Sequence, residues 1–318
     1  MDSERVLVTG GFGLIGFEIV RKLASKGYEV TVTDDLSMQS SNSKYKTNEK
    51  LPKGTEFIRI GTHSKSYVEE LSDHDFVYIF NFGSYSTDRY FEANPIDAIN
   101  KTVNGMINVL KIANRCNSKK VIYPSSGTIY GNQKAPQTEI LIPTPQTLYS
   151  ATKVYLEMIN SIYKGINTTA MRIFTGFGAR EIIKGKMASV VTLFTVGAIE
   201  GTPIDIYGDG SQKRDFIEAK DIAEIGYKLA ISEATPSIVN VGSGLSYSFN
   251  DLVSLIEKHL NIEIKKNYVK SKTRFVEETR ADVEELRKSV GFVPVGLEKR
   301  FPSYLEELTE IMEGRNQS

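Results

Sequence analysis

The 318-residue chain has one cysteine, three histidines and no tryptophan. A single cysteine, Cys116, excludes an internal disulfide, so a reducing, cytoplasmic setting is expected. His63, His74 and His259 are scattered without metal-ligand spacing, so no metal site is predicted. Lys plus Arg and Asp plus Glu both number 39. This zero net charge gives no indication of a nucleic-acid or membrane-surface partner.

Long apolar runs are also missing. No stretch of about 18 apolar residues occurs, and the first strand-like run begins within a few residues of Met1. We therefore expect neither a membrane span nor a signal peptide. The sequence has no internal repeat and no low-complexity block. Its length is enough for a substantial core and predicts two closely associated lobes.

Three glycines follow the first predicted strand, residues 6–8. Gly10, Gly13 and Gly16 form a G-x-x-G-x-x-G spacing, one residue wider at the front than the usual dinucleotide fingerprint, and an amphipathic helix pattern follows. Such a loop lets the backbone approach a pyrophosphate, and the new helix points free N–H groups at the anion. The pattern predicts a dinucleotide site; a purely structural turn is the alternative.

A second strand, residues 28–33, ends at Asp34, about 20 residues past the glycine loop. A carboxylate at this place can accept hydrogen bonds from the adenosine ribose and would repel a 2′-phosphate, so NAD is favoured over NADP. The alternative is that Asp34 caps a turn or helix. Residues 37–50, rich in Ser, Asn and Lys, are predicted to be a mobile loop.

Strand and helix patterns alternate over residues 1–175, and this predicts an α/β fold with a Rossmann-type doubly wound parallel sheet. The further strands are expected at 56–60, 76–82, 120–123 and 168–174, and the helices near 65–71, from Pro95 through Ala113 and at 149–163. Residues 176–318 are expected to form a smaller C-terminal α/β substrate lobe, of which some segments could return to the main sheet. The elements expected there are helices at 186–200, from 221, at 248–260, near 282–288 and near 303–313, and strands at 204–207 and 238–241.

Tyr149 and Lys153 stand four residues apart on a predicted helix. This spacing places a phenol and an ammonium on one face, where the positive charge favours the phenolate. Tyrosine normally titrates near pH 10, so a neighbouring cation would let it act as a base at physiological pH. A Tyr and a Lys at this spacing are often exposed residues without a catalytic role, but downstream of a dinucleotide loop they predict a catalytic pair.

A serine-rich loop follows the strand that is expected to stop at Pro124. Ser125, Ser126 and Thr128 would lie at the carboxyl end of that strand, where such sheets bind ligands and where a substrate hydroxyl could share a proton with Tyr149. The alternative is an ordinary loop between a strand and a helix.

Together these motifs resemble the extended short-chain dehydrogenase/reductase family, and within it NAD-dependent nucleotide-sugar epimerases of the UDP-glucose 4-epimerase type. The resemblance covers essentially the whole chain. The segments that carry it are Thr9–Gly16, Asp34, the Ser126 loop, Tyr149-x-x-x-Lys153, Arg172-Ile-Phe-Thr-Gly-Phe-Gly178, Tyr207-Gly-Asp-Gly-Ser-Gln-Lys-Arg-Asp-Phe-Ile217 and Asn240-Val-Gly-Ser-Gly244.

The resemblance implies NAD as cofactor and a nucleoside-diphosphate sugar as substrate. The glycine loop would cradle the pyrophosphate, Asp34 would bind the adenosine ribose, and Lys153 would also contact the nicotinamide ribose. Ser126 and Tyr149 are the implied acid/base pair. Further cofactor contacts are implied for Phe12, Leu14, Ile15, Thr62, Phe82 and Gly83, and substrate contacts for Ser84, Ser126, Thr175, Arg214 and Arg274.

Arg214 would bind the diphosphate of the substrate, a task that suits the planar guanidinium group. Arg274 is a second candidate for that diphosphate. Without the resemblance, Arg214 and Asp215 would be interpreted as a local surface ion pair.

The chain departs from the family pattern at five places. Thr62 stands where an Asp usually meets adenine, and Asn81-Phe-Gly-Ser84 replaces the usual His-Leu-Ala-Ala. Thr102 replaces an Asn of the proton-relay tetrad, Thr175 an Asn that usually contacts substrate, and Glu218 an aromatic residue or histidine. These departures concern the adenine and sugar pockets more than the catalytic pair.

The implied reaction begins when the Tyr149 phenolate removes the proton of the sugar C4 hydroxyl while a hydride passes to NAD. Return of the hydride to the other face of the 4-keto sugar gives net C4 epimerisation. A C4 dehydrogenase or 4-keto reductase with net NAD(H) turnover is the alternative. A 4,6-dehydratase is disfavoured because Gly127 and Thr128 stand where acidic residues are expected. A non-catalytic NAD-binding protein would be expected to lose the Tyr or Lys.

The resemblance also implies a homodimer. The expected interface is a four-helix arrangement formed by the helices near 94–116 and 149–163 of each subunit.

Overall fold

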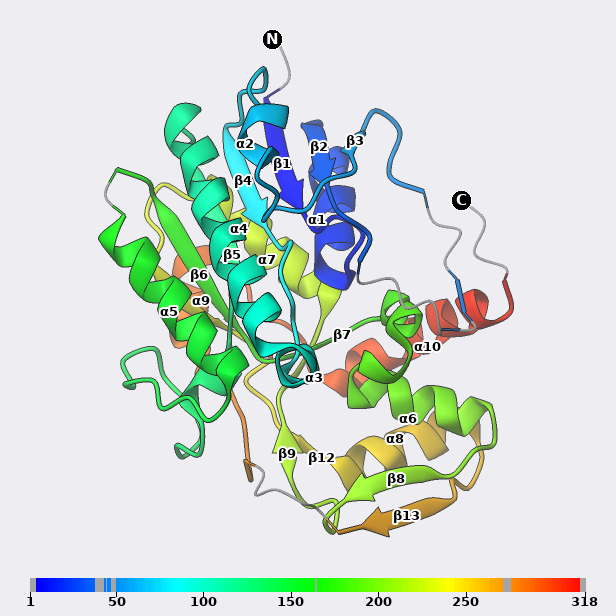
Figure 1. Cartoon of the computed structure of the whole chain (residues 1–318). Helices are drawn as coiled ribbons and strands as arrows, with labels where there is room; N and C mark the ends of the chain where they lie inside the picture. Colours follow the sequence, from blue (N-terminus) through cyan, green and yellow to red (C-terminus); the bar gives the residue numbers. More distant parts are fainter. Residues whose placement is uncertain are drawn as a thin grey trace.

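The computed structural model describes residues 4–37, 43, 45–46, 50–163, 165–270 and 276–314. At its centre lies a parallel seven-stranded sheet in the order β11-β6-β5-β4-β1-β2-β3 (Figure 1). Its strands are β1 (Arg5–Thr9), β2 (Glu29–Thr33), β3 (Glu56–Ile58), β4 (Tyr78–Asn81), β5 (Lys120–Ser126), β6 (Thr168–Ile173) and β11 (Ile238–Val241). The predicted doubly wound parallel sheet is confirmed. Most of the loop expected at 37–50 lies outside the described residues.

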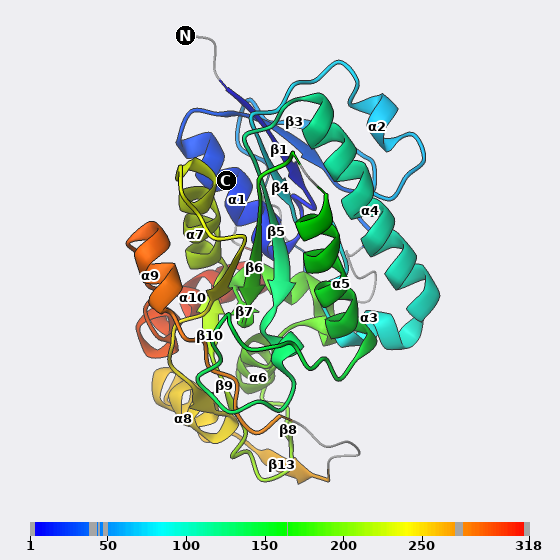
Figure 2. The ribbon, with the colours of Figure 1, turned by 90° about the vertical axis from the view of Figure 1, so that its left-hand side faces the viewer.

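Helices cover both faces of this sheet (Figure 2). One face carries α1 (Leu14–Ser25), α7 (Ala219–Ile231) and α9 (Glu284–Val290), and the other carries α2 (Tyr67–Glu70), α4 (Pro95–Arg115) and α5 (Leu148–Ile162). Helix α3 (Asp88–Ala93) packs against α4 and α5. Along β1, Val6 and Val8 pack into the first layer with Ile19 of α1, whereas Leu7 packs into the second with Val109 of α4. Because helices cover both faces, the strands need apolar side chains on both sides, and their sequences accordingly are largely apolar runs.

The sheet differs from the sequence prediction at β5, which continues through Pro124 to Ser126 instead of stopping at the proline. Beyond Ile122 this strand pairs only with β6, because its pairing with β4 ends there. A proline without an N–H is tolerated where a strand has a neighbour on one side only. As a result, Ser126 is the last residue of a rigid strand and not part of a loose loop.

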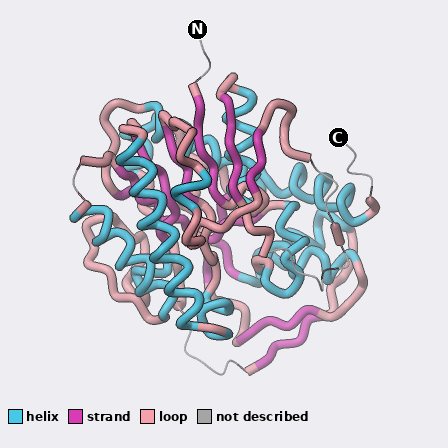
Figure 3. Tube along the Cα trace, turned by 45° about the horizontal axis from the view of Figure 1, so that its top comes forward, coloured by secondary structure: helices cyan, strands magenta, loops and turns pink. Residues whose placement is uncertain are grey.

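The second lobe packs beneath the carboxyl ends of the strands around a core of its own (Figure 3). Its helical elements are the 3₁₀ segment η2 (Ala179–Met187), α6 (Val190–Ile199), α8 (Phe249–Leu260) and α10 (Leu297–Met312), and its strands are β7 (Thr175–Phe177), β8 (Ile204–Tyr207), β9 (Lys213–Arg214), β10 (Phe216–Glu218), β12 (Tyr247–Ser248) and β13 (Lys266–Val269). A short 3₁₀ turn, η1 (Gly127–Tyr130), follows β5. The strands pair as β7 with β10, β9 with β12 and β8 with β13.

Three elements from beyond residue 176 return to the main sheet. Strand β11 pairs with β6, helix α7 packs against α1, and helix α9 packs against β11 and α7. Elements of the second lobe precede and follow α7 with β11, and again α9, so the two parts share several connections.

No single helix in the described ranges is long and apolar enough to cross a membrane, although η2 and α6 reach that length and composition together as a pair bent by 95°. Both members of this pair pack within the second lobe, η2 on α10 and α6 on α8. Over the same residues, no three His, Cys, Asp or Glu side chains are grouped as metal ligands would be.

A buried ion pair joins α5 to the sheet. Arg172 of β6 donates to both carboxylate oxygens of Glu157 at 3.0 and 2.8 Å, and both side chains are almost fully buried. Ser125 of β5 also donates to Glu157, and Arg172 donates to Tyr130 at 2.9 Å. Helix α5 carries Tyr149 and Lys153, so this pair fixes both residues relative to the end of β5.

We expect Glu157→Gln to destabilise the protein by about 3 kcal/mol, because removal of one partner leaves a buried charge without compensation. Urea unfolding would measure the change in free energy. Glu284→Gln is the matched control, since the Arg287–Glu284 pair is more than half exposed and should contribute under about 1 kcal/mol. Equal effects of the two substitutions would contradict a structural role of the buried pair.

Candidate active site

A cavity of about 420 Å³ lies at the carboxyl ends of the parallel strands, between the sheet and the second lobe. Ligands bind doubly wound sheets at this edge, near the point where the strand order reverses between β1 and β4. Every predicted site residue within the described ranges lines it: Gly10, Phe12, Gly13, Leu14, Ile15, Gly16, Asp34, Thr62, Phe82, Gly83, Ser84, Ser126, Tyr149, Lys153, Thr175 and Arg214. Arg274, the remaining one, lies outside the described residues.

The glycine loop leaves no room for side chains on its inner side. A Cβ on Gly10 would lie 2.5 Å from the carbonyl oxygen of Phe82, and one on Gly16 would overlap the carbonyl oxygen of Gly10. Gly13 precedes α1 and provides no side-chain cap for the first N–H groups of that helix. These donors border the cavity and have no partner within the helix. The loop therefore fits the pyrophosphate of a dinucleotide.

Asp34 lies at the end of β2 with its carboxylate held by the backbone. Its two oxygens accept hydrogen bonds from the N–H groups of Phe12 at 3.0 Å and Leu36 at 2.8 Å. Burial raises the pKa of Asp34, and these two hydrogen bonds counteract part of that rise. Each carboxylate oxygen can accept a second hydrogen bond, so this side chain fits the ribose hydroxyls of an adenosine.

Tyr149 is buried at the N-terminal end of α5, and its phenol lines the same cavity as Ser126. Burial raises the pKa of Tyr149 to about 12, because it disfavours the phenolate, while the nearby Ser126 hydroxyl lowers it. The sequence predicts that the positive charge of Lys153 favours the phenolate, but burial has the larger effect and the pKa of Tyr149 is raised. Ser126 is itself 2.9 Å from the hydroxyl of Thr128, and this contact orients it.

Lys153 lies one helical turn beyond Tyr149 and is fully enclosed. Its ammonium group is 5.5 Å from the centre of the Tyr149 ring and donates to the carbonyl oxygen of Pro124 at 3.1 Å. The Ser84 hydroxyl is 3.4 Å away. Burial lowers the pKa of Lys153 to about 8. Below that pH the residue is positively charged next to the phenol, so it can stabilise a phenolate there.

Arg214 reaches the cavity from β9 of the second lobe. Its guanidinium group donates to the carbonyl oxygens of Lys213 and Val276, and burial lowers its pKa to about 10. Over the residues that the structure describes, no carboxylate forms an ion pair with it. Such a half-buried cation is suited to a phosphate ligand.

The alternative of a local Arg214–Asp215 ion pair is wrong. Asp215 is completely buried and accepts hydrogen bonds from the backbone and hydroxyl of Ser243, from Gly244 N–H and from Ala281 N–H. Burial raises the pKa of Asp215 to about 6, and these donors oppose the rise. The residue joins three chain segments next to Arg214.

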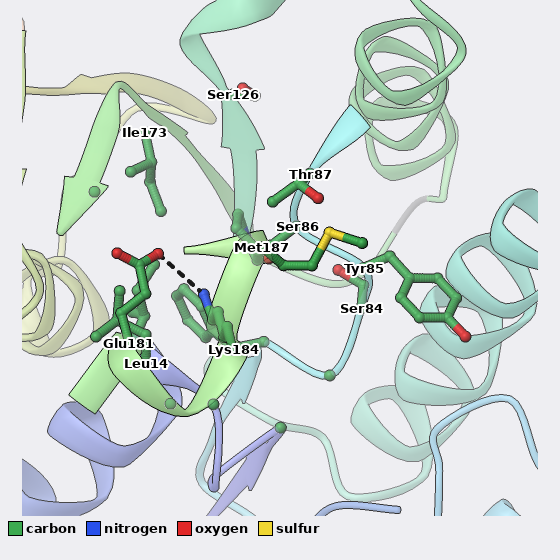
Figure 4. Close-up of a pocket in the computed structure, with 18 of the residues that line it drawn as sticks. Leu14, Ser84, Tyr85, Ser86, Thr87, Ser126, Ile173, Glu181, Lys184 and Met187 are labelled. Atoms are coloured by element: carbon green, nitrogen blue, oxygen red, sulfur yellow. Dashed lines mark hydrogen bonds and ion pairs between the residues drawn. The ribbon is translucent and has the colours of Figure 1, made fainter. Parts of the chain in front are cut away.

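Segment η2 forms a wall of the cavity that the sequence did not reveal, since a helix was expected only from residue 186. Figure 4 shows Glu181 and Lys184 joined across one turn of η2, and Met187 extending from the same segment toward the loop of Ser84 to Thr87. Arg180 and Glu181 stand two and three residues after the Arg172–Gly178 motif, and this closeness to the motif was the one signal in the sequence. Other cavity residues not foreseen are Leu36, His63, Tyr85, Asp88 and Lys101.

The five departures from the family pattern fall in different places. Thr62, Ser84 and Thr175 line the main cavity. Thr102 instead borders a second, smaller void together with Thr62 and Ser84, and its buried hydroxyl has no hydrogen-bond partner among the described residues. Glu218 lies outside the cavity and contacts Arg300 at 3.2 Å. The first three are therefore placed to affect ligands directly.

Comparison with known proteins agrees with the fold and with the cofactor expected at the glycine loop. The model of the NAD dependent epimerase/dehydratase family matches residues 6–242. The UDP-glucuronate 4-epimerase of Thermodesulfobacterium geofontis is 27% identical, over 96% of this chain and 97% of its own. The UDP-glucose 4-epimerase of Thermotoga maritima, solved with UDP-glucose, has a TM-score of 0.87 and 25% identity, covering 98% of this chain and 100% of that one.

A second solved structure, the UDP-N-acetylglucosamine 4-epimerase of Methanobrevibacter ruminantium M1 in complex with UDP-N-acetylmuramic acid, is similar to the same degree. Its TM-score is 0.87 at 27% identity, and 99% of this chain and 100% of that chain are covered. These findings confirm the resemblance that the sequence motifs carry. The chain belongs to the NAD dependent epimerase/dehydratase family.

Proposed function

We propose that the protein is an NAD-dependent nucleotide-sugar epimerase that inverts C4 of a nucleoside-diphosphate sugar through a 4-keto intermediate. The observation that carries this proposal is the meeting of Tyr149, Ser126 and Lys153 with the glycine loop in one cavity. Relatives and structural neighbours named as UDP-sugar 4-epimerases support it.

When bound, NAD supplies a positively charged ring that accepts a hydride and returns it. Tyr149 takes the proton of the C4 hydroxyl and later returns a proton to the same oxygen. Ser126 donates a hydrogen bond to the phenolate, and Lys153 provides the nearby positive charge. Proton transfer by a positioned side chain typically accelerates a reaction by about 10²- to 10⁴-fold.

Binding of the substrate diphosphate is assigned to Arg214. Its half-buried guanidinium gains a counter-charge when a diphosphate enters, and the bidentate geometry of arginine suits phosphate oxygens. Held at this end, the sugar would extend past Thr175 toward Tyr149. Rotation of the 4-keto sugar within the cavity would then present its other face for reduction.

A C4 dehydrogenase or 4-keto reductase that acts on a nucleotide-linked sugar is the second candidate. The observation in its favour is that Ser84 and Thr175, both departures from the family pattern, line the main cavity. Dehydration is disfavoured, because Gly127 and Thr128 follow Ser126 in η1 and neither is acidic.

We also propose that the protein is a homodimer, formed through α4 and α5. These helices pack side by side (Figure 2). Both carry exposed apolar side chains, which together would form an apolar surface. The members of this apolar surface are Ile96, Leu148, Tyr155, Met158 and Ile162. Isologous contact with a second copy would bury this surface in a four-helix arrangement.

A panel of nucleotide sugars tests the reaction. Incubation of the purified protein should interconvert C4 epimers of one of them without net change in the absorbance of reduced nicotinamide, because the hydride returns to the sugar. Chromatography of the sugars and absorbance together distinguish the candidates. Stoichiometric NADH formation or consumption would contradict epimerisation and support the dehydrogenase or reductase.

Tyr149→Phe should reduce turnover by at least about 10²-fold, because the substitution removes the proton acceptor and keeps the ring. NAD retained after gel filtration should equal that of the unaltered protein. Tyr155→Phe is the matched control, because its ring is half-exposed on the outer side of α5. Near-normal turnover of the Tyr149 variant would exclude this tyrosine as the catalytic base.

Met158→Glu should convert the dimer to a monomer, because it places a charge within the apolar surface of α5. Analytical ultracentrifugation would measure the mass. Ile140→Glu should leave the dimer intact, since Ile140 is 91% exposed in a loop outside both helices. A monomeric unaltered protein, or an intact Met158→Glu dimer, would be inconsistent with this interface.

A further inference from the structure

Asp88 is the first residue of α3, and it lines the cavity close to Tyr149. One helical turn further along α3, the ring of Phe91 packs edge-on against the ring of Tyr149, with 5.5 Å between the ring centres. After burial, the negative charge of Asp88 is a further cause of the raised pKa of Tyr149. The carboxylate of Asp88 and the phenol of Tyr149 therefore border the same part of the cavity.

The carboxylate of Asp88 has an unused acceptor. Its Oδ1 atom is enclosed and has no hydrogen-bond partner among the described residues. Burial raises the pKa of Asp88, the nearby Thr147 hydroxyl lowers it, and the charge of Glu92 raises it further. Rotation about the last side-chain bond exchanges the two oxygens, so either can turn toward the cavity. A hydrogen-bond donor on a ligand would therefore stabilise this carboxylate.

Two hydroxyl groups in the same wall also lack partners. Thr87 and Ser189 both line the cavity, and neither hydroxyl has a hydrogen-bond partner within the described ranges. Arg89 of α3 donates to the carbonyl oxygen of Lys186 in η2, so the segments that carry these hydroxyls meet. Figure 4 shows Thr87 on the loop that Met187 approaches from η2. Unused polar groups around one end of a cavity are typical of a site for a ligand with several hydroxyl groups.

The cations near this end of the cavity are already paired. Lys101 lies 3.0 Å from the carboxylate of Asp97, and Lys184 lies 3.4 Å from that of Glu181. The groups that shift the pKa of Asp88 include no cation. The charge of Asp88 is therefore not offset by these neighbours, and a second carboxylate brought beside it would be repelled.

We propose that Asp88 accepts a hydrogen bond from a sugar hydroxyl close to C4 and so selects a neutral hexose over the corresponding hexuronate. This inference rests on the proposed function, which brings C4 of the sugar to Tyr149. A hydroxyl group can donate to Asp88, whereas the carboxylate of a hexuronate has no proton to donate and carries the same charge. The 4-epimerases similar to this chain include one named for UDP-glucose and one named for UDP-glucuronate, and these two sugars differ by that one charge.

Calorimetric titration of the NAD-bound protein with UDP, UDP-glucose and UDP-glucuronate tests this role. The unaltered protein should bind UDP-glucose at least about 10-fold more tightly than UDP-glucuronate. Asp88→Asn should weaken UDP-glucose by about 3- to 10-fold, because the amide still accepts a hydrogen bond but without the charge. The same variant should bind UDP-glucuronate about 10-fold more tightly, because the repulsion is removed. UDP should bind unchanged, since it has no sugar.

Glu92→Gln is the matched control, because it removes one negative charge from an exposed side chain of the same helix. It should keep the preference of the unaltered protein, and so should Asp88→Glu, which keeps the charge. An unaltered protein that binds neither sugar nucleotide, or binds UDP-glucuronate as tightly as UDP-glucose, would overturn the proposal. An unchanged ratio of the two affinities in Asp88→Asn would also overturn it, and so would an equal loss for all three ligands, which indicates a deformed site.

If Asp88→Asn does not fold, as judged by circular dichroism, Asp88→Ser decides by the same comparison, since serine is well tolerated where a helix begins. Binding is measured without turnover, so failure of this inference and failure of the proposed function are distinguishable. A protein that prefers UDP-glucose but leaves C4 unchanged would contradict only the proposed reaction. A protein that epimerises UDP-glucuronate and binds it as tightly as UDP-glucose would contradict only the role of Asp88.

Discussion

The close approach of backbones at the glycine loop is the constraint on which the rest of the site depends. A Cβ on Gly16 would overlap the carbonyl oxygen of Gly10, and a Cβ on Gly10 would meet the end of β4 at Phe82. Only glycine lets β1, α1 and the β4 loop meet so closely. That meeting places the first N–H groups of α1 beside Phe82 to Ser84, and Ser84 in turn contacts Lys153.

Burial is the second general influence on this site. It disfavours charge on three groups at once, raising the pKa of Tyr149 and lowering those of Lys153 and Arg214. The shifts of Arg214 and Tyr149 can be reversed by a ligand of the right charge. A phosphate would stabilise the Arg214 cation, and a positive ring beside Tyr149 would stabilise its phenolate. The cavity is thus suited to ligands that carry charge at both ends.

Sequence patterns predict the sheet well because its strands are buried on both faces and therefore read as apolar runs. Tyr149 and Lys153 are found by their spacing, since helical geometry alone puts them on one face. Segments α3 and η2 are missed, because six and nine residues show too little periodicity. The burial of Asp215 is missed as well, since its partners Ser243 and Ala281 come from distant parts of the chain. Asp215 and Arg180 are determined by tertiary contacts that no local pattern encodes.

Contacts at several points fix the position of the second lobe relative to the sheet. This explains how residues of both parts can line the same cavity. Asp215 joins β9 to the segments of Ser243 and Ala281, so Arg214 projects from a fixed strand. Strand β11, which leads to Ser243, is itself part of the main sheet. A displacement of the sheet edge would therefore move Arg214 with it. The distance between Arg214 and Tyr149 on α5 is consequently set by strand pairing, which is much stiffer than a flexible linker between two independent domains.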